Sequence, residues 1–151
     1  MTQLSPNFSL AELTASGTAR ARGLSNAADD QALANLTRTA QAMEAVRSLL
    51  GGPIQVSSGY RSPEVNRAVG GSRTSAHCLG YAVDFTCPGF GTPFAVCNAI
   101  LASSIVFDQL IHEYGAWAHI SFDPRARRMP LTIASAARGY MTGILPIRPH
   151  G

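Results

Sequence analysis

The stretch SAHCLGYAVDF at residues 75–85 decides how this sequence is expected to fold. Residues 81–86 alternate between two faces, which predicts a strand with apolar side chains on one face and Asp84 on the other. Gly80 lets the backbone turn closely between this strand and His77. Asp84 then stands as a lone acid among apolar neighbours. Burying such a charge is costly unless it is paired or binds a metal.

A second stretch, WAHISF at residues 117–122, predicts another strand. Its apolar side chains suit the core, while Trp117 and His119 share the opposite face. Residues 107–113 form a further strand pattern just before it, so the two are expected to make a β-hairpin around 114–116.

His77, Asp84 and His119 are the candidate metal ligands. A catalytic zinc site uses three protein ligands and keeps one position open for water, and two histidines with one carboxylate from separate strands meet that need. Taken singly, each residue also has an ordinary interpretation. A lone histidine is usually a satisfied polar group, and Asp84 could accept backbone hydrogen bonds in a turn. Spacing alone leaves both interpretations open.

The remaining pattern predicts an α+β fold in a single domain, with an N-terminal arm over 1–25 and an irregular C-terminal tail over 124–151. We expect a small, mainly antiparallel sheet with helices packed on one side and the metal site on the sheet. The other expected elements are a helix over 27–50 capped by Asn26, a strand over 54–57, a short helix over 63–69 capped by Ser62, a helix over 92–103 and an edge strand over 131–133.

Composition narrows the class of protein. Of the 151 residues, 46% are hydrophobic and only 14% charged, which is typical of a folded globular chain. The net charge of +3 has its densest cluster at Arg125, Arg127 and Arg128, and no aromatic-rich basic stripe accompanies it. We therefore expect a solvated cluster of arginines and no nucleic acid partner.

The sequence also bears on location and on disulfides. Residues 1–25 lack the pattern of a signal peptide, and no apolar stretch is long enough to span a bilayer. We expect a protein made in the cytoplasm, without membrane insertion. An odd count of three cysteines argues against a disulfide framework, although a bridge between Cys87 and Cys97 stays possible.

Three motifs together resemble the zinc D-alanyl-D-alanine carboxypeptidase family, which includes phage L-alanyl-D-glutamate endopeptidases and vancomycin-resistance D-Ala-D-Ala dipeptidases. The opening segment NFSL at 7–10 resembles phage members as well. The three motifs are SGYRS at 58–62, Ser75-x-His77-x-x-Gly80-x-Ala82-x-Asp84, and Trp117-x-His119.

The resemblance implies that His77, Asp84 and His119 bind Zn²⁺. It implies that Arg61 steadies the substrate carbonyl or the oxyanion that forms from it. Ser75 and Trp117 are expected beside Arg61 as substrate-binding residues, Ser75 without a defined role.

One position departs from the family. In well-known members an acid three residues before the last zinc histidine is the general base, and here Ala116 stands there. A hairpin loop over 114–116 would place Glu113 on the face of His119 and make it the base. A loop one residue longer would bring His112 to that face instead. Asp108 is a weaker candidate, as a partner behind the ligands.

The leading hypothesis is a zinc-dependent peptidase, a carboxypeptidase or an endopeptidase, that hydrolyses bacterial peptidoglycan stem peptides or crosslinks. A phage or prophage lysis protein, acting on the cell wall as a monomer, fits this hypothesis. The alternative is a catalytically inactive, zinc-containing module that binds the cell wall or belongs to a phage structure. The motifs leave open which peptide bond is cut.

Overall fold

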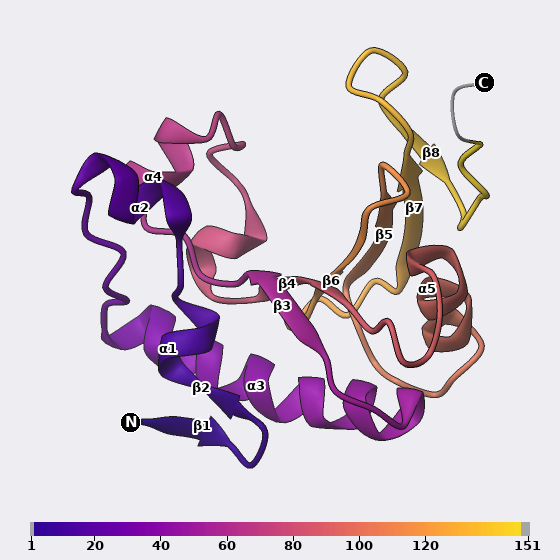
Figure 1. Ribbon diagram of the computed structural model, residues 1–151, viewed down its shortest axis with the longest axis horizontal. Coiled ribbons are helices and arrows are strands. Elements are labelled where there is room, and N and C mark those ends of the chain that lie inside the picture. The colour runs from indigo at the N-terminus through magenta and orange to yellow at the C-terminus, as the bar shows by residue number, and fades with distance from the viewer. Residues whose placement is uncertain (1, 149–151) are drawn as a thin grey trace.

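The computed structural model describes residues 2–148, and its centre is a six-stranded sheet (Figure 1). The strand order is β3-β4-β6-β5-β7-β8, and only β5 and β7 pair in parallel. The strands are β3 (Gln55–Ser58), β4 (Ala82–Thr86), β5 (Gln109–Glu113), β6 (Trp117–Ser121), β7 (Met129–Ile133) and β8 (Tyr140–Thr142). The helices are α1 (Leu10–Leu13), α2 (Gly17–Arg22), α3 (Asp30–Leu50), α4 (Pro63–Ala68), α5 (Pro93–Leu101) and the 3₁₀ helix η1 (Ala76–Leu79).

The register of the central strands sets which side chains meet. Asp84 lies directly opposite His119 across β4 and β6. In the β5–β6 hairpin, Glu113 lies opposite Trp117 and Ile111 opposite His119. The loop is therefore 114–116, as the sequence predicted, and the parity that brings Glu113 to the face of His119 is confirmed.

Two helices, α3 and α5, cover one face of the sheet (Figure 1). Apolar side chains of both helices and of the inner strands form one core. Among its fully buried members are Leu36, Met43, Ile100, Val83, Phe85, Leu110 and Ile120. Alternation along each strand then leaves Asp84 and His119 on the other face, so the α+β prediction with helices on one side is confirmed.

Helix α3 also holds the turn between η1 and β4. Asn35 Nδ2 donates to Leu79 O at 2.9 Å, and Thr39 Oγ1 donates to Gly80 O at 2.7 Å. Gly80 has φ +82°, a conformation that favours glycine, and a Cβ there would lie 2.7 Å from Ala32 O. Helix α3 thereby holds the turn after η1 in place and so fixes the position of His77 in η1.

The N-terminal arm packs onto this core through Phe8 and Leu13, both fully buried. It contains the small sheet of β1 (Gln3–Ser5) and β2 (Phe8–Ser9), followed by α1 and α2. The expected start of the long helix was wrong, because α3 begins at Asp30 with Asp29 as its N-cap, accepting from Ala32 N at 2.8 Å.

Asn26, the predicted cap, instead ties three segments together. Its Nδ2 donates to Thr14 O at 2.7 Å and to Tyr60 O at 3.0 Å, and its Oδ1 accepts from Ser62 N at 2.7 Å. Ser62 is the N-cap of α4, as predicted. Asn26 therefore connects the N-terminal arm to the backbone on both sides of Arg61.

The C-terminal segment differs most from expectation. The predicted edge strand over 131–133 is longer, begins at Met129, and lies inside the sheet between β5 and β8. β8 is the edge strand, so the expected irregular tail contributes two strands to the sheet.

Two further sequence expectations concern disulfides and membranes. Cys87 and Cys97 are separate, buried thiols, and burial together with the charge of Glu113 raises the pKa of Cys97 to about 12. Within residues 2–148, none of the helices has both the length and the apolar character that a membrane crossing requires.

Candidate metal centre and its cleft

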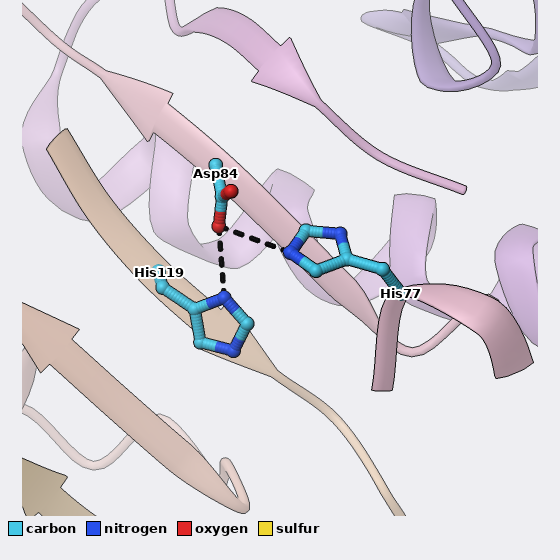
Figure 2. A group of neighbouring side chains, drawn as sticks. All are labelled: His77, Asp84 and His119. Carbon is cyan, nitrogen blue, oxygen red and sulfur yellow. Dashed lines mark hydrogen bonds and ion pairs between the residues drawn. The ribbon is translucent and has the colours of Figure 1, made fainter. Parts of the chain in front are cut away.

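His77, Asp84 and His119 converge on one point on the face of the sheet away from α3 and α5, and all three are buried (Figure 2). Asp84 Oδ1 lies 3.2 Å from His77 Nε2 and 2.8 Å from His119 Nδ1. One potential ligand atom from each residue lies within 4.8 Å of the others. Asp84 and His119 come from neighbouring strands, whereas His77 comes from η1 and not from a strand, which corrects the expectation of separate strands.

The backbone around His77 orients its ring. Ser75 caps η1, and its Oγ accepts from His77 N at 3.2 Å. His77 Nδ1 lies 2.7 Å from Gly59 O. A carbonyl oxygen only accepts, so Nδ1 carries the proton, and the lone pair of Nε2 points at Asp84.

The electrostatics of the cluster favour a charged carboxylate. Burial alone would raise the pKa of Asp84, but the hydrogen bond from His119 and the neighbouring His77 ring outweigh it and hold the pKa well below its ordinary value. For His119, burial acts in the opposite direction and lowers the pKa. Its hydrogen bond to Asp84 and the negative charges of Asp84 and Glu113 outweigh burial, so the pKa of His119 is raised overall. The cluster is thus an anionic oxygen placed between two imidazole nitrogens.

This donor set fits a zinc ion. Two imidazole nitrogens and one carboxylate oxygen are ligands typical of catalytic zinc, and three protein ligands leave one position for water or substrate. The bond from His77 Nδ1 to a backbone carbonyl is the kind of outer contact that fixes metal-binding histidines. His77, Asp84 and His119 are therefore the residues that would hold the metal.

Glu113 lies beside the cluster. Its Oε1 is 3.8 Å from His119 Nδ1, and its Oε2 accepts from Trp117 Nε1 at 2.8 Å. Burial and, to a smaller extent, the charge of Asp84 raise the pKa of Glu113. Ala116, at the position where the family has its acid, is exposed in the hairpin loop. The acid at the site thus comes from β5, one strand away from His119.

The alternative base, His112, and the proposed partner of the ligands, Asp108, both lie away from the cluster. His112 is buried on the face toward α5, where its ring lies 5.8 Å from that of Phe94 and its Nδ1 is 2.9 Å from Leu145 O. Asp108 is wrong as a partner of the ligands. It binds Arg127 through two side-chain hydrogen bonds of 2.9 Å.

The predicted arginine cluster is exposed to solvent, as expected, and two of its members also anchor a loop. Arg127 is tied to Asp108, and Arg128 donates to Ser103 O at 2.6 Å and lies over the ring of Phe107. Arg125, the third member, has a side chain that is 61% exposed.

Arg61 enters the site from the loop after β3. Its backbone N donates to His77 O at 3.1 Å, and its Nη2 donates to Ser75 Oγ at 3.1 Å. Arg61 Nε is buried and finds no hydrogen-bond acceptor among residues 2–148. Ser75 Oγ therefore accepts from both Arg61 and His77, and it holds a guanidinium that lines the cleft.

These residues share a cleft of about 650 Å³. The sequence expected Arg61, Ser75, Glu113 and Trp117 there, and all four line it with the metal ligands. Sequence reasoning missed the rest, although the Gly70-Gly71 pair and the exposed tyrosines were visible signals. The lining residues that it missed are Val69, Gly70, Gly71, Ser72, Thr74, Ala76, Gln109, Ile111, Tyr114, Leu131 and Tyr140.

Comparison with known proteins identifies the family. The family model described as Peptidase M15 matches residues 6–121, which contain every ligand and both catalytic candidates. None of the curated proteins searched matches the chain. The match covers more than half of the sequence, so the chain belongs to the Peptidase M15 family, whose members are zinc peptidases that act on peptidoglycan-type substrates.

Proposed function

We propose that this protein is an active zinc peptidase that hydrolyses a peptide bond in peptidoglycan stem peptides or crosslinks, with Glu113 as general base. One observation carries the proposal. The chain lacks an acid at position 116, yet Glu113 Oε1 lies 3.8 Å from His119 Nδ1 on the adjacent strand. The acid has a different position in the sequence but still stands beside the metal ligands.

Each residue has a defined task in this mechanism. Zinc, when bound, supplies a Lewis acid that polarises the scissile carbonyl and acidifies a water molecule. Glu113 Oε1 accepts a proton from the attacking water and later returns it to the leaving amine. The bond from Trp117 Nε1 holds the other carboxylate oxygen, so one oxygen is left free for the transfer.

Arg61 stabilises the charge that develops on the carbonyl oxygen. Its guanidinium is held by Ser75 and lines the cleft with the metal ligands, so its charge is in place before substrate arrives. Donors that need no reorganisation contribute most to oxyanion stabilisation. Ser75 acts by positioning Arg61 and His77.

A lysis protein of a phage or prophage, working as a monomer on the bacterial cell wall, is the biological role that we propose for this activity. The resemblance of Asn7–Leu10 to the opening of phage members supports it. The family supports the class of substrate, and the mechanism above applies equally to a carboxypeptidase and to an endopeptidase.

Digestion of purified peptidoglycan by the zinc-loaded protein, followed by mass spectrometry, tests the proposal and identifies the bond. We expect new amino termini in the digest, and we expect Glu113→Gln to lower kcat by about 10²–10⁴-fold, the usual contribution of a general base. The zinc content of this variant should stay unchanged. Glu64→Gln, at an exposed glutamate of α4, is the matched control and should cut like the wild type.

A catalytically inactive module that binds the cell wall or serves a phage structure is the second candidate. Ala116 at the family's acid position favours it. The digestion separates the two. Peptidoglycan that sediments with the protein but releases no new amine would overturn the enzymatic proposal, and so would a Glu113→Gln variant that cuts as fast as the wild type.

A further inference from the structure

The β7–β8 hairpin lies outside residues 6–121, the part of the chain that the family model matches, yet it forms part of the cleft. Leu131 of β7 and Tyr140 of β8 both line the cleft with the metal ligands. Figure 1 shows this hairpin extending the sheet on the side away from α4 and the loop that follows α4. The cleft therefore has a wall that the matched region does not supply.

The register connects this wall to the candidate base. Glu113 lies opposite Ile133 in the parallel pair of β5 and β7, and Ile133 lies opposite Tyr140 in β8. Residues in one such row share a face of the sheet, so Tyr140 stands on the same face as Glu113. Two strand spacings separate their backbones by about 10 Å. That distance suits a neighbouring subsite and not the reacting bond.

The wall is aromatic and apolar. Tyr114 and Trp117, with ring centroids 5.5 Å apart, continue from Tyr140 and Leu131 toward Glu113. Tyr140 is 61% exposed and Tyr114 is 43% exposed, so both offer free ring surface. The facing segment, residues 69–76, contributes mostly small side chains to the lining, among them Gly70, Gly71, Ser72 and Thr74, and it also contributes Val69.

Charge restricts what this wall can hold. Apart from the imidazoles, Arg61 is the one cationic side chain among the described residues that line the cleft, and it lies at the other end of the sheet order, after β3. A substrate carboxylate against the aromatic rings would lose water without gaining a partner. Rings and aliphatic groups suit small apolar residues and flat peptide planes.

We propose that Tyr140 is a specificity-determining residue that packs against an uncharged segment of the peptide, such as one containing alanine, on one side of the scissile bond. The β7–β8 hairpin thereby adds a subsite beyond the residues that flank the cut. This inference rests on the proposed function, because it assigns part of the same cleft to the same substrate.

Kinetics on a synthetic stem pentapeptide, its crosslinked dimer and their truncated forms test the assignment. For the peptides that reach the subsite, we expect Tyr140→Ala to raise KM by about 5–10-fold with kcat nearly unchanged, as loss of uniform binding does. Peptides shortened on that side should not distinguish the variant from the wild type. Tyr140→Phe should keep the wild-type KM, because the ring makes the contact.

The matched control is Met141→Ala, the next residue of β8, which points to the other face and does not line the cleft. An equal KM for Tyr140→Ala and the wild type on every peptide would overturn the proposal. A rise in KM for Met141→Ala as large as that for Tyr140→Ala would overturn it too, since the effect would then come from the hairpin as a whole.

Calorimetric titration of the pentapeptide and crosslinked dimer into proteins that carry Glu113→Gln, with and without Tyr140→Ala, gives a readout that is independent of turnover. We expect a Kd about 5–10-fold weaker after Tyr140→Ala for the ligand that reaches the subsite, in step with the KM change. If the wild type cuts no peptide, the proposed function fails while this titration still decides the role of Tyr140. Equal Kd values for the two proteins on both ligands would reject the subsite.

Discussion

The indole nitrogen of Trp117 donates a 2.8 Å hydrogen bond to Glu113 Oε2, and the two residues lie directly opposite each other in the β5–β6 hairpin. Strand β6, which carries His119, therefore also holds the Glu113 side chain in place through Trp117. Since the bond occupies one carboxylate oxygen, the other is left 3.8 Å from His119 Nδ1. From the sequence we expected Trp117 to bind substrate. The hydrogen bond to Glu113 indicates that Trp117 also positions the acid.

Replacing Trp117 by Phe keeps a ring and removes the donor. We expect kcat to fall about tenfold with KM little changed, since a hydrogen bond to a charged group is worth about 1.5–3 kcal/mol and part of that loss appears in the barrier. Steady-state kinetics on a cleaved stem peptide measure both constants.

Tyr114→Phe is the control for this experiment, because it keeps the ring beside Trp117 and loses only a hydroxyl. It should stay within about twofold of the wild-type kcat, as a substitution that removes no contact to the acid. A higher KM at constant kcat for Trp117→Phe would contradict the positioning role and return Trp117 to substrate binding.

We expect zinc binding to depend on His77, because its ring is fixed by Gly59 O with Nε2 facing Asp84. We expect equilibrium dialysis to show one zinc per wild-type chain and a large loss of affinity for His77→Ala. Zinc should raise the melting temperature of the wild type, because a ligand of the native state stabilises it, and should not raise that of the variant.

His112→Gln serves as the matched histidine control. His112 lies on the face toward α5, so its replacement should leave the zinc stoichiometry unchanged even if it lowers the melting temperature. Undiminished zinc binding by His77→Ala would reject the ligand assignment.

Local rules explain why part of the site could be predicted from sequence. Alternation along 81–86 and 117–122 placed Asp84 and His119 on one face, and the three-residue loop fixed the pairing of Glu113 with Trp117. These features depend on residues close in sequence. The partner of His77 Nδ1 is the carbonyl of Gly59, 18 residues away, and no local sequence pattern predicts such a contact.

The errors have the same origin. Asn26 and Asp29 are both acceptable helix caps, and contacts of Asn26 with Thr14, Tyr60 and Ser62 decided between them. The parallel pairing of β7 with β5 joins segments about 20 residues apart, so the tail looked irregular in sequence. Tyr140 was missed as a cleft residue for that reason.

Gly80 is a position where one added methyl group should harm the site. Its φ is +82°, and an added Cβ would lie only 2.7 Å from Ala32 O, so Gly80→Ala has two separate costs. We expect a loss of about 2 kcal/mol or more in the free energy of unfolding, from left-handed strain and overpacking against α3. Since the turn carries His77, zinc affinity should fall as well.

Gly89→Ala is the control for this substitution, because a Cβ there has open space and no positive φ. Its free energy of unfolding should change by no more than about 0.5 kcal/mol. Urea denaturation of both variants checks the comparison, and equal stabilities would show that the contact of Gly80 with α3 does not constrain the turn.

Asp108 links stability to pH at a place remote from the metal ligands. Its carboxylate is almost fully buried and accepts two side-chain hydrogen bonds and one backbone bond from Arg127, with Arg125 3.8 Å away. The bonds from Arg127 outweigh the effect of burial and lower the pKa of Asp108 in the folded state. The unfolded chain therefore takes up the proton first as the pH falls.

The sign of the pH effect follows from this order of protonation. Above about pH 5 both states are ionised and the full stabilisation is present; it is lost as the pH falls through the lowered folded pKa. Asp108→Asn cannot titrate, so we expect it to be less stable than the wild type by about 1–3 kcal/mol at pH 7, with the gap narrowing steadily below about pH 5. Urea denaturation across pH 2–7 in the presence of a chelator, compared between the two proteins, isolates the effect of Asp108 from that of the other acids.

Asp123→Asn is the control, because it removes a pair with the exposed Arg125 and should lower the free energy of unfolding by less than about 1 kcal/mol. A stability gap between Asp108→Asn and the wild type that stays constant down to pH 2 would contradict the link.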